Sequence, residues 1–158
     1  MNTFSAVQQI ENYITKFEND QCDSWEYEHT PYLEKKLDEL IEEEVSEFNL
    51  KIWDWPEFHL YTIADPIIFC NNKYLDSSYL YSKIFSQINN MEYLDYLVEN
   101  LAPSIHHGSL STWSTDLIVS IKANVLKVIE TKGQGWFKLI NETLELLDSE
   151  LSIRLKGR

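Results

Sequence analysis

Histidine and cysteine are the side chains of this chain best suited to bind a metal or to attack a substrate, but their spacing predicts neither chemistry. His106 and His107 are adjacent. They would point about 100° apart on a helix and to opposite faces of a strand, and neither geometry suits one tetrahedral zinc ion. The HExxH zinc motif and the Gly-x-Ser-x-Gly nucleophile elbow are missing from the sequence. We therefore expect no metal, no cofactor and no enzyme activity, with the histidine pair in a polar loop.

The remaining reactive residue types give no stronger signal. Gly133-Gln134-Gly135 lacks the further glycine and the Lys-Ser/Thr end of a phosphate loop, so we predict a turn between two helices. Because the chain has 26 acidic residues, many pairs of carboxylates could be chosen as candidates for acid–base catalysis. The presence of such pairs therefore does not indicate an active site. His29 and His59 stand alone in the sequence. Cys22 and Cys70 form no CxxC pair, and we expect free thiols, with one disulfide between them as the alternative.

The acidic residues are concentrated in the first sixty positions, where aromatic residues accompany them. Residues 1–60 contain 15 Asp and Glu and 4 Lys, a formal charge of −11, whereas the other 98 residues contain 11 acids and 9 bases. Carboxylates attract a cationic partner from a distance, and Trp and Tyr are frequent anchors at interfaces. The partner-binding residues that we expect are Asp23, Trp25, Glu26, Tyr27, Glu28, Glu39, Glu43, Glu47, Trp53, Asp54, Trp55 and Glu57.

The net charge of −13 limits the class of partner. Nucleic acids and anionic membranes both select for Lys and Arg, so the charge predicts that the chain binds neither. A basic protein is the partner class that remains, although an acidic helix face that only meets solvent has the same composition. Trp53 and Trp55 also leave two alternatives, packing against the helices or projecting as anchors. We expect Trp113 and Trp136 in the core or at its edge.

An apolar period of three to four residues predicts the helices that position these side chains. Residues 4–17 form the first helix, and the segment through His29 is expected to be a loop. Thr30 and Pro31 predict the start of a second helix through Phe48, on which Glu39, Glu43 and Glu47 form one acidic flank. Glu44 falls inside the apolar stripe of that helix. We expect it to reach solvent near the helix end, or to pair with Arg154 or a lysine.

The rest of the chain also has mainly a helical period. Residues 50–72 are ambiguous, with a weak strand-like alternation over 58–64 and a possible short helix that Asp65-Pro66 would start and that would run through Cys70. Helices are expected after caps at Asp76 and Ser114, and after the break at Asn89-Asn90. Pro103, Gly133 and Gly135 mark the expected limits of the last ones. The sequence thus predicts a single all-α domain over 1–158, a compact bundle of about six helices, with a possible small β element near residues 50–64. We recognise no secretory signal and no membrane-spanning stretch in the sequence, so a cytoplasmic location is expected.

The combination of small size, strong acidity and acid–aromatic segments at 23–28 and 53–57 resembles the immunity proteins of bacterial toxin systems, of the colicin and contact-dependent growth inhibition types. The resemblance implies a cytoplasmic protein that neutralises a basic toxin domain, most plausibly a nuclease, by direct protein–protein interaction. Two alternatives remain open from the residues themselves. One is a nucleic-acid mimic that blocks a DNA-binding protein, and the other is a non-catalytic adaptor domain.

Overall fold

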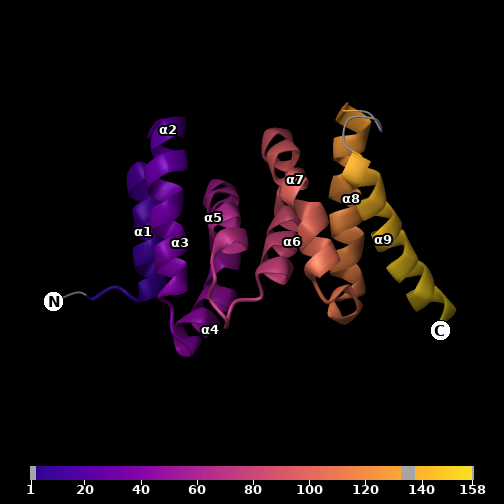
Figure 1. Ribbon diagram of the computed structural model, residues 1–158, viewed down its shortest axis with the longest axis horizontal. Helices are drawn as coiled ribbons and strands as arrows, with labels where there is room; N and C mark the ends of the chain where they lie inside the picture. Colours follow the sequence, from indigo (N-terminus) through magenta and orange to yellow (C-terminus); the bar gives the residue numbers. More distant parts are fainter. Residues whose placement is uncertain (1–2, 133–137, 158) are drawn as a thin grey trace. The chain divides into compact units, whose positions relative to one another are not determined.

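Helices account for the regular structure throughout the described chain. The structure, a computed structural model, describes residues 3–132 and 138–157 (Figure 1). The predicted all-α class is confirmed, and no strand occurs within those residues. Within those residues there are about eight helices rather than six, without counting the three-residue segment Cys22–Ser24, and the small β element expected near residues 50–64 is not seen. The chain divides into two compact units, Met1–Leu80 and Tyr81–Arg158.

The first unit begins with the predicted amphipathic helix, α1 (Ala6–Phe17). The Ser5 hydroxyl accepts a hydrogen bond from the Gln8 amide at 3.1 Å and so caps the helix. One apolar face of α1 is buried in the unit, where the helix packs on α4 and α5. Ser5 and the 3.6-residue period together account for the position of this helix.

The segment predicted to be a loop before His29 is helical instead. α2 (Cys22–Ser24), the π-helix η1 (Trp25–His29) and α3 (Thr30–Asp38) follow one another without a break. Thr30 has helical backbone angles, so the expected N-cap at this residue is wrong. The wide turn closes with the Thr30 amide bonded to the Trp25 carbonyl, five residues back.

The predicted second helix through Phe48 is two helices, because α3 ends at Asp38 and α4 (Glu42–Lys51) begins after Ile41. Side chains satisfy the backbone on both sides of the break. The Asn72 amide nitrogen donates to the carbonyls of Leu37 and Leu40 at 2.7 and 2.8 Å. The Glu44 carboxylate accepts from the Ile41 amide at 3.0 Å, so Glu44 caps α4 rather than interrupting an apolar stripe.

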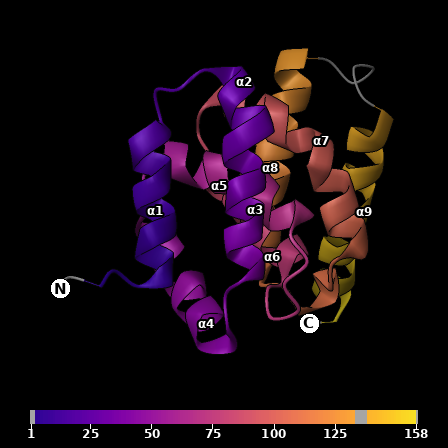
Figure 2. The same cartoon turned by 60° about the vertical axis from the view of Figure 1, so that its left-hand side comes forward.

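The ambiguous region after α4 is also helical. A 3-10 turn, η2 (Ile52–Asp54), leads into α5 (Glu57–Phe69). The buried positions of α5 are spaced as on one helix face rather than alternating, and Pro66 lies inside the helix instead of starting one. These positions are His59, Leu60, Ile63, Ala64, Pro66 and Ile67. α3 and α5 pack against each other, and Figures 1 and 2 show α2 at one end of the α1–α3 pair and α4 at the other.

The boundary between the units falls within α6 (Ser77–Gln87), which starts after Asp76 as predicted. The second unit continues with α7 (Met91–His107), η3 (Leu110–Thr112), α8 (Thr115–Lys132) and α9 (Lys138–Lys156). Asn90 caps α7, and the Ser114 hydroxyl caps α8 by accepting from the Leu117 amide at 3.1 Å.

Two expectations for the second unit are wrong. α7 does not end before Pro103 but includes it, and His106 and His107 lie in its last turn rather than in a loop. Trp113 is buried, as expected. It packs so closely on Gly108 that a Cβ there would lie 2.7 Å from the indole. The turn predicted at Gly133-Gln134-Gly135 and the placement of Trp136 lie outside the described residues.

A buried asparagine joins two helices of the second unit. The Asn124 side chain lies in α8 and donates to the carbonyls of Phe85 and Ile88 at 2.8 and 3.1 Å. These carbonyls lie at the end of α6, where helical backbone acceptors have no partner in their own helix. Asn72 performs the same function for the end of α3 in the first unit. Each unit therefore has one distant asparagine that terminates a helix.

Candidate functional site

The most exposed acid–aromatic residues lie along α2 and η1. Tyr27 is 73% exposed, and three of its neighbours in sequence, Asp23, Glu26 and Glu28, are exposed carboxylates. None of the three makes an ion pair with a described residue of the chain. We name these four residues the η1 surface. Its charge and its aromatic ring are free to meet another molecule.

The inner side of the same helix holds an aromatic cluster that fixes η1 to α1. The Trp25 indole NH donates to the Phe17 carbonyl at 3.0 Å, so this ring is anchored in its own chain and only half-exposed. His29 is 3% exposed and stacks on Phe17 with ring centroids 4.3 Å apart. Tyr13 lies edge-on to the same imidazole. The cluster therefore positions the η1 surface but does not present Trp25 as a free anchor.

Both ring nitrogens of His29 have a partner. Nε2 lies 2.8 Å from Asp20 Oδ2, and Nδ1 lies 2.7 Å from Tyr13 Oη. The hydrogen bond from His29 lowers the pKa of Asp20, whereas burial raises the pKa of Tyr13. A carboxylate–imidazole–hydroxyl sequence resembles an activated nucleophile. A hydroxyl that holds its proton more tightly than usual is poorly suited to that task, so the arrangement is better explained as a link between α1 and η1.

The acids of the predicted second helix lie elsewhere in the first unit. Glu39 follows the end of α3, while Glu43 and Glu47 belong to α4, so the three do not form one continuous helical flank. Glu39 pairs with Lys36 at 3.5 Å and Glu47 with Lys51 at 2.7 Å. The hydrogen bond from Lys51 lowers the pKa of Glu47. Since α2 and α4 lie at opposite ends of the α1–α3 pair (Figure 2), the first turn of α4 does not extend the η1 surface.

The second acid–aromatic segment is largely packed. Trp55 is 8% exposed and lies edge-on to Phe48 in the core. Of the two alternatives for this residue, it therefore packs against the helices and does not project as an anchor. The indole NH of Trp53 donates to the Asn49 carbonyl at 2.7 Å, and its ring is half-buried. Asp54 is exposed and Glu57 half-buried. This segment contributes charge to the surface, but its best-packed aromatic ring is not available to a partner.

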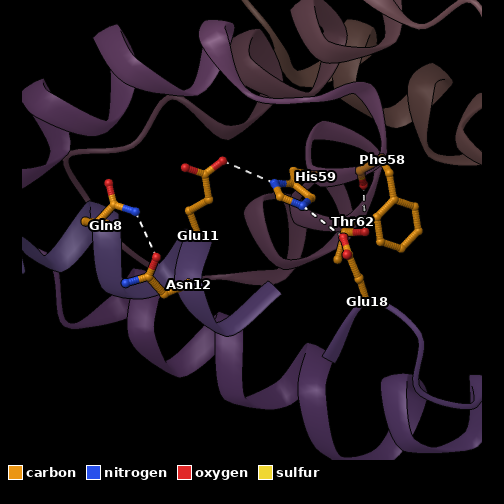
Figure 3. Close-up of polar contacts among 7 residues, drawn as sticks. All are labelled: Gln8, Glu11, Asn12, Glu18, Phe58, His59 and Thr62. Atoms are coloured by element: carbon orange, nitrogen blue, oxygen red, sulfur yellow. Dashed lines mark hydrogen bonds and ion pairs between the residues drawn. The ribbon is translucent and has the colours of Figure 1, made fainter. Parts of the chain in front are cut away.

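A second buried histidine, His59 of α5, lies between the carboxylates of Glu11, in α1, and Glu18, the residue that follows α1 (Figure 3). His59 Nδ1 is 3.1 Å from Glu11 Oε2, and Nε2 is 3.3 Å from Glu18 Oε2. Figure 3 shows the imidazole between the two carboxylates, which approach it from opposite sides. Neither contact was predicted from the sequence. The usable signal is the spacing of Glu11 and Glu18, since residues seven apart share one face of a helix.

Beside these clusters, the residues that the structure describes offer two thiols and a pocket. In the described part of the chain no group of three or more His, Cys, Asp and Glu side chains is arranged to hold a metal ion. Cys22 is exposed, Cys70 is buried, and both are free thiols. A pocket of about 390 Å³ lies among α1, α3 and α4, bordered by Tyr32, Lys36 and Glu39, and none of its polar lining residues is buried. Among residues 3–132 and 138–157, no helix has the length and apolar content to cross a bilayer.

Comparisons with protein-family models, with curated proteins and with solved structures find no match to this chain. Its function must therefore be inferred from the surfaces and clusters described above.

Proposed function

We propose that the chain is a non-catalytic inhibitor that binds a basic protein, in the manner of a toxin immunity protein, with the η1 surface as its principal contact. The observation that supports this proposal is the combination of three exposed carboxylates, without ion pairs in the described structure, around a Tyr side chain that is 73% exposed. Carboxylates accelerate encounter with a cationic partner, and a rigid aromatic side chain slows dissociation once it is packed. The proposed partner is a basic toxin domain, most plausibly a nuclease, whose substrate-binding cleft is itself cationic.

The residues expected to contact a partner differ in how exposed they are in the structure. Asp23, Glu26, Tyr27 and Glu28 are central, because they are exposed along one helical run. Asp54, Glu57 and Glu43 are peripheral carboxylates that add to the attractive field. Trp25 supports the surface from within through its bond to the Phe17 carbonyl, whereas Trp55 packs on Phe48 in the core. The interruption between α3 and α4 disfavours the nucleic-acid mimic, because a long uninterrupted row of carboxylates is not formed there.

A binding experiment tests the proposal. A candidate basic toxin domain is expressed alone, and its association with the chain is measured at two salt concentrations. The association rate should fall as salt rises, because exposed charges separated by more than about 10 Å are screened at 0.1 M salt. The triple variant Asp23→Lys, Glu26→Lys, Glu28→Lys should slow association, and Tyr27→Ala should speed dissociation.

A matched control separates local contact from total charge. Glu99, Glu130 and Glu142 are exposed acids of the second unit, and their reversal to Lys changes the net charge by the same amount. If the control triple slows association as much as the η1 triple, the η1 surface is not the contact. Absence of binding to any basic toxin domain tested, with both chains folded, would overturn the proposed function itself.

A further inference from the structure

His59 and His29 differ in the number of ring protons that their hydrogen-bond partners require. The two partners of His29 are a carboxylate and a hydroxyl. A neutral imidazole satisfies both, because Nε2–H donates to Asp20 while Nδ1 accepts from Tyr13. The two partners of His59 are both carboxylates. Ionised carboxylates only accept hydrogen bonds, so both contacts of His59 are hydrogen bonds only when the ring carries two protons.

The contacts of His59 join two helices. Glu11 lies in α1 and Glu18 caps its end, about two helical turns or roughly 10 Å further along the axis. Both reach the same imidazole on α5. The ring is 7% exposed. The other groups packed on it are Trp55 and Phe58, which do not titrate, and no described cation contacts the ring. Loss of one ring proton therefore leaves Glu11, whose side chain is 23% exposed, or Glu18, at 39%, facing a nitrogen lone pair instead of a donor.

We propose that Glu11, His59 and Glu18 form a protonation-dependent clasp that holds α1 against α5. With the imidazolium present, both carboxylates are bound and α1 is held at two points. Deprotonation removes one hydrogen bond, so α1 opens more often when the ring is neutral. The inference concerns the first unit alone and does not depend on the proposed partner.

Hydrogen exchange of the full chain at about pH 5.5 and 8.5 tests the clasp. After correction for the intrinsic pH dependence of exchange, the opening constant of buried α1 amides such as Ile10 and Ile14 should rise about tenfold at the higher pH. This is the scale expected for one charge-assisted hydrogen bond. The amides of α3, in the same unit, serve as the internal reference and should change less.

Two variants test whether His59 and its carboxylate partners cause the pH dependence of α1 opening. His59→Gln cannot titrate and should abolish the pH dependence of α1 opening. Glu18→Gln keeps the histidine but replaces one carboxylate by an amide that can donate to a neutral ring, so it should also flatten the dependence, and it remains informative if the first variant does not fold. His29→Gln is the matched control, a buried histidine whose contacts need no extra proton, and it should retain the response. A wild-type chain without a response, a response that persists in Glu18→Gln, or one that disappears in His29→Gln would overturn the clasp.

Discussion

Replacement of Asn124 should show how strongly the second unit depends on a single side chain. Its amide donates two hydrogen bonds to the Phe85 and Ile88 carbonyls at the end of α6, and the residue is 4% exposed. Asn124→Ala removes both bonds and leaves two carbonyls without their side-chain donor. At about 1 kcal/mol for each net hydrogen bond, and more for each buried acceptor left unsatisfied, we expect a loss of roughly 2–4 kcal/mol. A typical domain has only about 5–15 kcal/mol of stability.

The substitution Asn124→Asp tests whether the loss of stability comes from the missing donor. It keeps the shape of the side chain but replaces the donor by an acceptor that faces two carbonyl oxygens. Near pH 7 we expect Asn124→Asp to destabilise the chain more than Asn124→Ala does. At a pH low enough to protonate the carboxyl, we expect Asn124→Asp to be less destabilising than it is at pH 7. Urea unfolding followed by circular dichroism measures both losses, with the exposed Asn19→Ala as the control. A loss below about 1 kcal/mol for Asn124→Ala, or an Asp variant more stable than the Ala variant at pH 7, would refute the reasoning.

Three further predictions concern the first unit. Glu44→Ala should cost about 1 kcal/mol in urea unfolding, because the Ile41 amide loses its carboxylate acceptor at 3.0 Å, and an equal loss in Glu42→Ala would contradict the capping role. Burial, with contributions from Asp38 and Asp65, raises the pKa of Glu34, so the folded chain favours its neutral form. Stability is therefore lost as pH rises from the unfolded to the folded pKa, and Glu34→Gln should stabilise the chain near pH 7 but not near pH 3. Burial also raises the pKa of the Cys70 thiol, so a thiol reagent should label exposed Cys22 quickly and Cys70 only on unfolding, and equal rates in the native chain would count against this.

Local signals predicted the helices whose ends are set by nearby residues. An apolar stripe preceded by Ser114, whose hydroxyl caps the first turn, predicts α8. The apolar stripe of α1 alone predicts a start at residue 4, and the cap at Ser5 is the local signal that locates the start of this helix. The helix after Asp76 follows from the same kind of cap. In each case the capping side chain lies three residues before the amide that it accepts from. A single sequence contains all the information needed to locate such an end.

Ends and contacts set by distant residues were not predictable in the same way. The break between α3 and α4 is satisfied partly by Asn72, more than thirty residues away, while the apolar period continues across it. Pro66 and Pro103 suggested boundaries, yet both lie inside helices. His59 finds its two carboxylates only because α1 and α5 pack together. The composition of the η1 surface could be predicted, but not its helical form.

The wide turn at Trp25–His29 has a consequence for how this chain tolerates changes in length. A π-helical turn accommodates one residue more than an α-helical turn between the same two ends. Removing one residue from 26–28 would therefore leave an ordinary α-helical turn between ends that keep nearly their present orientation. The same deletion inside α3, which has no such extra residue, would rotate everything before it by about 100°. A single-codon deletion should therefore be tolerated better in the wide turn than in the regular helix that follows it.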